Sequence, residues 1–433
     1  GRFAEAIDAW EELLRDCQLV LGADHPDTLN VRNNLAVAYD SVGRFAEAID
    51  AWEKLLPDCQ QVLGADHPYT LTVRNNLALA YYTVCRFGEA IELFGQVLAE
   101  QERVLGPDHP KTLKIRNDLA SAYYSVGRFA EVIDAWEKLL PDCRRVLGAD
   151  DPVTLNVRNN LASAYYSVGR LAEAIELYEQ VLAERERVLG ADDPVTLNVR
   201  DNLAVAYKSV GRFAEAIDAW EKLVPDCRRV WGADHPDTLK TRNNLALVYK
   251  SVGRFAEAID AWEKLLPDYQ RVLGADDPVT LTVRNNLALA YLSVGRFGEA
   301  IELFEQVLAE QERVLGPDHP DTLKTRNNLA SAYYSVGRLA EAIDAWEKLL
   351  PDCRRVLGAD HPYTLTVRNN LALAYKSVGR LAEAIDAWEK LLPDCQRVLG
   401  PEHPLTKRVE KNLEAAKREM NPPDAPSPET GED

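Results

Sequence analysis

Asparagine is the side chain that recurs most regularly where it could bind another molecule. Counting Gly1 as repeat position 1, the sequence repeats every 42 residues, and asparagine occupies positions 33 and 34 of most copies. An asparagine amide offers a hydrogen-bond donor and an acceptor, so a spaced row of amides suits the backbone of an extended peptide whatever its sequence. The pattern therefore indicates recognition through hydrogen bonds.

Cysteine and histidine also recur, but their spacing argues against disulfide or metal chemistry. Six of the seven cysteines share position 17, each at least one whole repeat from the next, and other repeats carry Gln, Arg or Tyr there. The seven histidines stand at position 25, one per loop, where three repeats carry Asp. A zinc site needs clustered ligands, whereas His and Asp can both accept a backbone N–H, so position 25 is interpreted as a helix N-cap. We expect no metal, no cofactor and a reducing compartment, the cytoplasm.

Motifs of catalysis are missing from the sequence. Neither G-x-S-x-G, G-x-x-x-x-G-K-[ST] nor H-E-x-x-H occurs. The recurring carboxylates lie at helical spacing on a polar face, which indicates solvation. A net charge of −19 argues against a nucleic-acid protein, and no apolar run approaches the roughly 20 residues of a membrane span. We predict a protein that is not an enzyme and binds neither nucleic acid nor membrane.

Each repeat predicts two helices. In the second repeat, residues 45–56 place apolar side chains on one helical face. Pro57 follows, but other repeats carry Ala there, so we expect one long helix that bends at the proline and ends at Gly64 in the left-handed conformation. A second helix begins near Pro68 and contains the asparagines. Cys85 replaces the glycine of position 1, at a modest cost if that position needs a positive φ.

The pattern N-L-A-x-A-Y-x-x-V-G-R-x-x-E-A-I-x-x-W/F resembles the tetratricopeptide repeat, with a period of 42 residues in place of about 34. This longer form is similar to the repeats of kinesin light chain and to arrays in bacterial multidomain regulators. The resemblance implies an all-α fold, an α-solenoid wound as a right-handed superhelix of ten helix-turn-helix repeats. It also implies that the asparagine-bearing helices line the concave face. The repeats are residues 1–42, 43–84, 85–126, 127–168, 169–210, 211–252, 253–294, 295–336, 337–378 and 379–420.

The two ends of the array differ. Residues 403–420 predict a last helix in which Glu414 and Lys417 replace the usual Ala and Tyr, as expected of a solvating cap. Residues 421–433 are acidic and proline-rich, which is typical of disorder. The chain starts without Met and in mid-pattern, so a longer protein is expected. Four apolar residues near the start have no preceding helix to cover them, namely Phe3, Ile7, Trp10 and Leu14. A missing domain or head-to-tail self-association would cover them.

Variation among the copies marks one stripe on the asparagine-bearing helix. Positions 30, 34, 37 and 41 trace one helical stripe, with positions 33 and 40 on its border. The stripe is either merely solvated or a binding surface, and we expect one asparagine position to face the groove and the other to brace the adjacent helix. The resemblance to kinesin light chain implies a cargo groove lined by these asparagines. The predicted binding residues are Asn34, Asn76, Asn160, Asn202, Asn244, Asn286, Asn328 and Asn370; Asn33, Asn75, Asn117 and Asn159; and Tyr82, Tyr124, Tyr166, Lys208, Lys250, Tyr334 and Lys376.

The leading interpretation is a scaffold that binds a protein or an extended peptide. With Arg32, Arg74, Arg158 and their equivalents, the asparagine-bearing helix is net basic, so the groove is predicted to favour acidic or aromatic peptides. Two alternatives stay open. The array could be the sensor arm of a larger signal-transduction ATPase, or a structural array that associates with itself.

Overall fold

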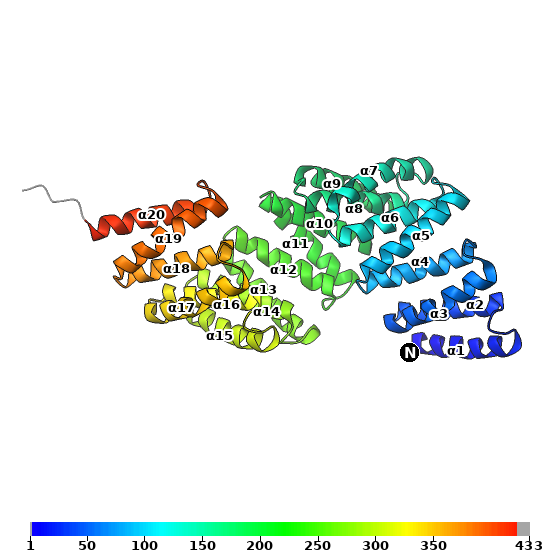
Figure 1. Ribbon diagram of the computed structural model, residues 1–433, viewed down its shortest axis with the longest axis horizontal. Helices are drawn as coiled ribbons and strands as arrows, with labels where there is room; N and C mark the ends of the chain where they lie inside the picture. The colour runs from blue at the N-terminus through cyan, green and yellow to red at the C-terminus, as the bar shows by residue number, and fades with distance from the viewer. Residues whose placement is uncertain (1, 422–433) are drawn as a thin grey trace, which may run out of the picture. The chain divides into compact units, whose positions relative to one another are not determined.

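The computed structural model describes residues 2–421, which contain twenty α-helices and no β-strand (Figure 1). The helices of the first half are α1 (Arg2–Val20), α2 (Pro26–Ser41), α3 (Phe45–Leu63), α4 (Pro68–Thr83), α5 (Phe87–Leu105), α6 (Pro110–Ser125), α7 (Phe129–Val146), α8 (Pro152–Ser167), α9 (Leu171–Val188) and α10 (Pro194–Ser209). The remaining helices are α11 (Phe213–Val230), α12 (Pro236–Ser251), α13 (Phe255–Val272), α14 (Pro278–Ser293), α15 (Phe297–Val314), α16 (Pro320–Ser335), α17 (Leu339–Val356), α18 (Pro362–Ser377), α19 (Leu381–Leu399) and α20 (Pro404–Met420). The all-α class and the ten-repeat organisation are confirmed. The predicted disordered tail lies, after Asn421, outside the described residues.

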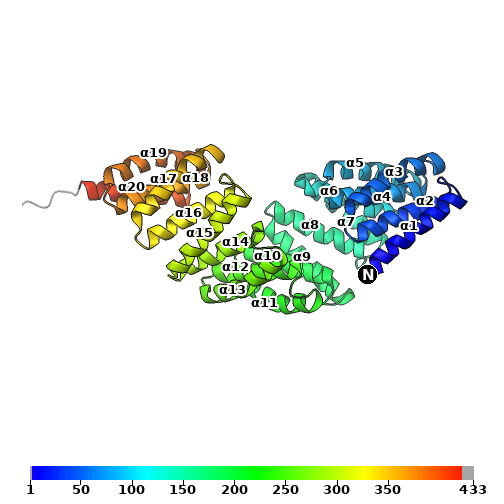
Figure 2. The same cartoon turned by 90° about the horizontal axis from the view of Figure 1, so that it is seen from below.

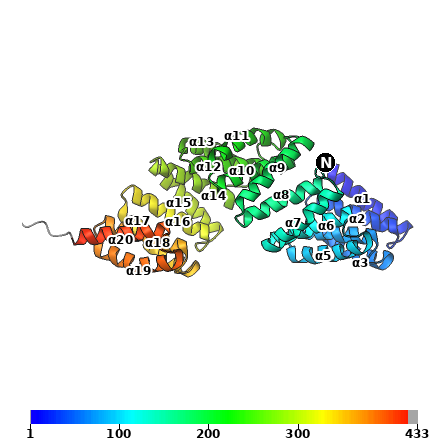
Figure 3. The same ribbon diagram turned by 90° about the horizontal axis from the view of Figure 1, so that it is seen from above.

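The chain divides into two compact units, Gly1–Ala219 and Trp220–Asp433, with the boundary inside α11. Within each unit, each helix packs on the helices directly before and after it, as α2, α3 and α4 do at the blue end of Figure 2 and α18, α19 and α20 at the red end of Figure 3. Most even-numbered helices also contact the next even-numbered helix, for example α6 with α8 and α16 with α18, and no comparable contact joins odd-numbered helices in the described part of the chain. The even-numbered helices, which carry the asparagines, are therefore the more closely spaced set in each unit.

The even-numbered helices start at a proline that follows a capping side chain. His25 Nδ1 accepts the backbone N–H of Asp27 at 3.2 Å, and Asp151 accepts that of Val153 at 2.8 Å. Proline suits the first turn because its missing N–H needs no partner there. The predicted N-cap role of position 25 is confirmed for both residue types.

The odd-numbered helices run through their internal prolines without a break. Helix α3 continues past Pro57 and ends at Gly64, as predicted. Gly64 has φ 102° and ψ 154°, so its φ is positive but its ψ is extended, and the predicted left-handed helical conformation is wrong. Cys85 has φ 62°, which confirms that position 1 needs a positive φ.

The core of each unit lies where successive helices meet. Trp52, Leu77 and Tyr81 are buried there, and so are the thiols of Cys59 and Cys143. Burial raises the pKa of both thiols to about 11, so they stay protonated and unreactive. All seven cysteines are free.

Candidate peptide-binding surface

One polar stripe on the even-numbered helices stays accessible after these helices have packed. It consists of repeat positions 30, 34, 37 and 40. On α4, Thr72 is exposed and Asn76, Leu79 and Tyr82 are half-buried, whereas Leu77 on the adjoining face is buried. The other complete repeats show the same pattern, so within each unit the stripe continues from one even-numbered helix to the next.

The asparagines of position 33 lie beneath the stripe. Asn33 is buried, and its Oδ1 accepts from Nε1 of Trp52 on α3 at 3.0 Å and from Nδ2 of Asn76 on α4 at 3.2 Å. Asn117 is held in the same way by Trp136 and Asn160. Position 33 therefore joins three helices. Asn33 and Asn117 therefore hold the helix packing together, whereas Asn75 and Asn159 are half-buried. The place of Asn33, Asn75, Asn117 and Asn159 in a binding surface stays a prediction.

The asparagines of position 34 are half-buried, and several are fixed in one orientation. Each donates from Nδ2 to the position-33 carbonyl of the preceding repeat, at 3.2–3.3 Å, in Asn76, Asn160, Asn328 and Asn370. The amide oxygen of each of these four accepts no hydrogen bond within the described residues. Asn34, Asn202, Asn244 and Asn286 share the half-buried position. Position 34 thus carries an acceptor row on the accessible side.

Two position-33 asparagines lack this bracing. Where the odd-numbered helix carries Phe94 or Tyr178 in place of tryptophan, the buried Oδ1 of Asn75 or Asn159 has no partner among the described residues. The hydroxyl of Tyr178 bonds Ser163 instead, at 2.8 Å. The hydrogen bond between the tryptophan of position 10 and the asparagine of position 33 was not predicted from the sequence. Its signal is that most repeats with Trp at position 10 follow a repeat with Asn at position 33.

The tyrosines of position 40 connect one repeat to the next. Each hydroxyl lies 2.8–3.1 Å from a serine Oγ of the following repeat, in the pairs Tyr82–Ser125, Tyr124–Ser167, Tyr166–Ser209 and Tyr334–Ser377. Their half-buried rings stay on the stripe. These tyrosines therefore offer ring surface more than a free hydroxyl.

The lysines of position 40 fall into two kinds. Lys376 pairs with Glu419 at 3.2 Å. Lys208 and Lys250 are half-buried without an ion pair in the described structure, and burial lowers the pKa of both ammonium groups. These two are cations whose charge is still available to a ligand.

The arginines of position 32 turn away from the stripe. Arg32 pairs with Asp58 at 2.6 Å and donates to the carbonyl of Lys54, close to Pro57 on α3. Arg158 is buried and pairs with Glu184. The prediction that these arginines give the groove a basic character is wrong, because they bind the following odd-numbered helix.

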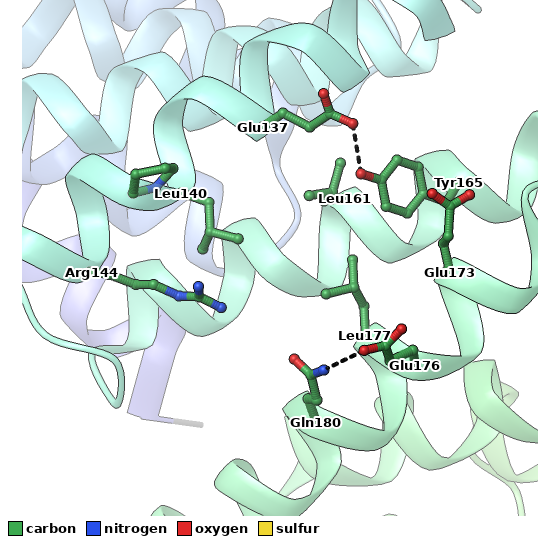
Figure 4. Close-up of a pocket in the computed structure, with 10 residues that line it drawn as sticks. Glu137, Leu140, Arg144, Leu161, Tyr165, Glu173, Glu176, Leu177 and Gln180 are labelled. Carbon is green, nitrogen blue, oxygen red and sulfur yellow. Dashed lines mark hydrogen bonds between the residues drawn. The ribbon is translucent and has the colours of Figure 1, made fainter.

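The other side of unit 1 carries a shallow cavity of about 410 Å³ between α7, α8 and α9 (Figure 4). The Tyr165 hydroxyl donates to Glu137 at 2.6 Å, and the Arg170 guanidinium lies 3.9 Å from the Tyr165 ring centroid. Burial and the hydrogen bond to Glu137 raise the pKa of Tyr165 to about 12. The same Arg–Tyr contact recurs in nine repeats, which identifies it as a structural junction.

No helix of the described residues has the length and apolar character to cross a membrane. Nor do residues 2–421 bring three or more His, Cys, Asp or Glu side chains together as a possible metal site.

These features define an α-solenoid of helical hairpins with an accessible stripe on the even-numbered helices of each unit. The tetratricopeptide repeat model matches residues 1–56, 41–99, 85–141, 119–183, 153–225, 202–267, 237–309, 284–351 and 324–387. The chain therefore belongs to the tetratricopeptide repeat family. Repeats of this kind typically form protein-interaction scaffolds with extended binding surfaces.

Solved structures show similar arrays. The nearly identical TPR-like repeats of a kinesin light chain-type protein from Podosopora anserina are 32% identical, covering 46% of this chain and 95% of that one, with a TM-score of 0.44. BtubC (BKLC) from P. vanneervenii is 22% identical, and the match covers 54% of this chain and 94% of that one, with a TM-score of 0.46. The apo form of RapI is 11% identical, and the match covers 81% of this chain and 98% of that one. Its TM-score of 0.58 supports the fold. No curated protein matches the chain by sequence.

Proposed function

We propose that the chain is a non-catalytic scaffold in the cytoplasm that binds an extended peptide or protein segment along the stripe. One observation carries the proposal. The positions that differ among nearly identical repeats are those left accessible on the even-numbered helices, while the flanks of those helices are packed.

The position-34 amides supply the general part of recognition. The bond from Nδ2 to the preceding repeat holds each amide oxygen in place before a ligand arrives, which lowers the entropy cost of binding. Such a row can accept N–H groups from a peptide backbone of any sequence.

The position-40 side chains supply the specific part. Tyr124 and Tyr166 present rings for aromatic side chains, and the unpaired ammonium of Lys208 attracts carboxylates. The proposed preference for acidic or aromatic peptides therefore depends only on the side chains at repeat position 40. The arginines of position 32 contribute nothing to it.

Peptides selected from a random library against the full chain test this proposal. The triple variant Tyr124→Ala, Tyr166→Ala, Lys208→Ala should raise the dissociation constant of stripe-binding peptides by at least about tenfold, which corresponds to about 1.4 kcal/mol of binding free energy. Lys138→Ala on α7, which removes an exposed lysine paired with Asp134, is the matched control and should bind normally. Unchanged affinity in the triple variant would overturn the assignment of the stripe.

A second candidate function, head-to-tail self-association, is favoured by α1. Leu13 is 42% exposed there, whereas its counterpart Leu55 in α3 is fully buried, and Leu19 and Val20 are also exposed. The residues that the sequence predicts to be uncovered are less exposed than these three. Ile7 is buried, Trp10 and Leu14 are half-buried, and the Phe3 side chain lies outside the described set. They pack on α2, which covers one side of α1.

Sedimentation velocity over a concentration series tests this second candidate. Self-association through α1 predicts a sedimentation coefficient that rises with concentration and a variant, Leu13→Glu, that stays monomeric. A concentration-independent monomer for the unmodified chain would discard the candidate and leave the stripe proposal intact.

A further inference from the structure

A second cavity, of about 240 Å³, lies in unit 1 where the end of α5 meets the first turns of α4 and α6. Its lining residues are Asp66, Pro68, Leu71, Thr72, Gln101, Val104, Leu105, His109 and Lys111. Gln101 is only 7% exposed, and its Oε1 has no hydrogen-bond partner among the described residues. Buried polar atoms are normally bonded, so this acceptor requires a donor that the chain does not supply.

In another repeat, an arginine side chain of the chain itself occupies the place that corresponds to this cavity. Gln101 stands at repeat position 17, and repeat five carries Arg185 there, 2% exposed. The Arg185 Nη2 donates to Asn156 Oδ1 at 2.7 Å, and its Nη1 donates to the carbonyl oxygen of Val195 at 3.1 Å. A guanidinium group therefore fits between an odd-numbered helix and the two even-numbered helices beside it.

The cavity at Gln101 keeps the acceptors that surround Arg185. By repeat position, Asn156 corresponds to Thr72 and Val195 to Lys111. The Thr72 hydroxyl donates to the Pro68 carbonyl at 3.0 Å and keeps its lone pairs for an incoming donor. The backbone carbonyl of Lys111 takes the place of that of Val195. Glutamine is shorter than arginine and adds a third acceptor, so space and acceptors remain where the guanidinium would lie.

We propose that this cavity binds a guanidinium group, supplied by an arginine side chain of a protein or peptide partner. A guanidinium is planar, carries five N–H donors and is weakly hydrated, so it can satisfy several fixed acceptors in a partly enclosed site. Asp66 at the cavity already pairs with Arg103 at 2.6 Å, which shows that its rim accommodates guanidinium chemistry. Lys111 is exposed, so solvent screens its opposing charge.

The same acceptor recurs in unit 2. Gln311 is 2% exposed and its Oε1 is likewise unpartnered. Asp321 stands where Lys111 stands in unit 1 and pairs with Lys324 at 2.9 Å, so no lysine at this repeat position opposes a cation there. We expect the Gln311 position to bind a guanidinium at least as tightly as the Gln101 cavity.

Methylguanidinium titrated into the full chain tests the proposal by ligand-observed NMR. Methylammonium, a cation without the planar fork, and urea, a planar but neutral analogue, are the comparison ligands. Methylguanidinium should bind at least about tenfold more tightly than either, because it alone combines charge with a planar array of five N–H donors. The double variant Gln101→Arg, Gln311→Arg should fold, since arginine is native at this position in α9, and should lose this binding.

Two further variants make the result decisive. Arg185→Gln should open one additional site, so that methylguanidinium binds with higher stoichiometry and restores part of the thermal stability lost by the variant. The triple stripe variant should bind methylguanidinium normally, which separates this site from the position-40 side chains of the proposed peptide surface. Equal binding of methylammonium, or undiminished binding by the double variant, would overturn the proposal and indicate attraction to the acidic surface only.

Discussion

Residues 43–168 in unit 1 and 253–378 in unit 2 are nearly identical three-repeat blocks, yet the hydrogen bonds of one half-buried asparagine differ between them. In the second block, Asn285 Oδ1 accepts from Thr325 Oγ1 and from Asn328 Nδ2, each at 3.3 Å. The counterpart in the first block, Asn75, has no partner for its buried Oδ1. Both donors are missing because Ile115 and Asp118 replace the threonine and the asparagine.

Asp118 shows what this exchange does to the packing between α4 and α6. Its Oδ2 is also buried without a partner, so an acceptor stands where the other repeats place a donor. Burial raises the pKa of Asp118 to about 6, against the opposing effects of the Lys114 charge and a hydrogen bond from Asn117. A protonated Asp118 would offer an O–H to the Asn75 oxygen. The two blocks therefore share a fold but differ in how pH affects their cohesion.

The largest predicted effect is a pH-dependent stability confined to unit 1. The folded-state pKa of Asp118 lies above the ordinary value of 3.8, so the folded protein keeps this proton while the unfolded chain loses it. The free energy of unfolding around α6 should fall as pH rises from about 4 to about 6 and level off above, by about 3 kcal/mol in total. Hydrogen-exchange protection factors of α6, compared with those of α16 over this range, measure the effect.

Reciprocal substitutions are the controls for this prediction. Asp118→Asn should flatten the pH profile of α6 and raise its protection at neutral pH. Asn328→Asp should impose the same profile on α16. If α6 and α16 respond to pH alike in the unmodified chain, the interpretation of Asp118 is wrong.

The second effect concerns the tryptophan that braces position 33. Trp346→Phe removes the donor that Nε1 supplies to Asn327 Oδ1 at 2.9 Å and leaves Asn370 Nδ2, at 3.2 Å, as the remaining donor. The lost hydrogen bond and the smaller ring should together cost about 2 kcal/mol. Urea unfolding of Trp346→Phe, Asn327→Ala and the double variant measures the coupling between the two side chains, which should be about 1 kcal/mol. Additive effects would contradict a direct bond.

Whether the structural role of a repeat position can be predicted from the sequence depends on whether that role is set within one helix or by neighbouring helices. A period of 42 residues and the apolar pattern determine the hairpins, their number and the capping role of position 25, because these depend on local chemistry repeated ten times. Positions 33 and 34 could not be separated in this way, since both lie near the edge of one helix and both carry Asn. Their roles depend on the neighbouring helices: Asn33 meets Trp52, whereas Asn76 reaches back to Asn33. The arginines of position 32 were misjudged for the same reason.

A third, smaller effect follows from position 1, where Cys85 in the first block corresponds to Gly295 in the second. Cys85 is the one non-glycine residue of the described chain with a positive φ, 62°, and Gly295 has φ 79°. Cys85→Gly should therefore stabilise the turn between α4 and α5 by about 1 kcal/mol, and Gly295→Cys should destabilise its counterpart by a similar amount. Equal urea midpoints for both variants and the unmodified chain would show that this turn tolerates a side chain without strain.

The smallest effect on stability separates the two kinds of position-40 contact. In the first block Tyr166 bonds Ser209, and in the second Lys376 pairs with Glu419. Because the Lys376 pair is partly exposed, Lys376→Met should change the free energy of unfolding by less than about 0.5 kcal/mol. Its effect on peptide binding should also be small, since Glu419 already neutralises the ammonium, whereas Lys208→Met removes an unpaired charge from the stripe. An acidic peptide that binds the unmodified chain should therefore distinguish Lys208→Met from Lys376→Met at low salt and lose that distinction at high salt. Equal losses for the two variants would mean that the total charge of the surface, and not the unpaired lysine, attracts the peptide.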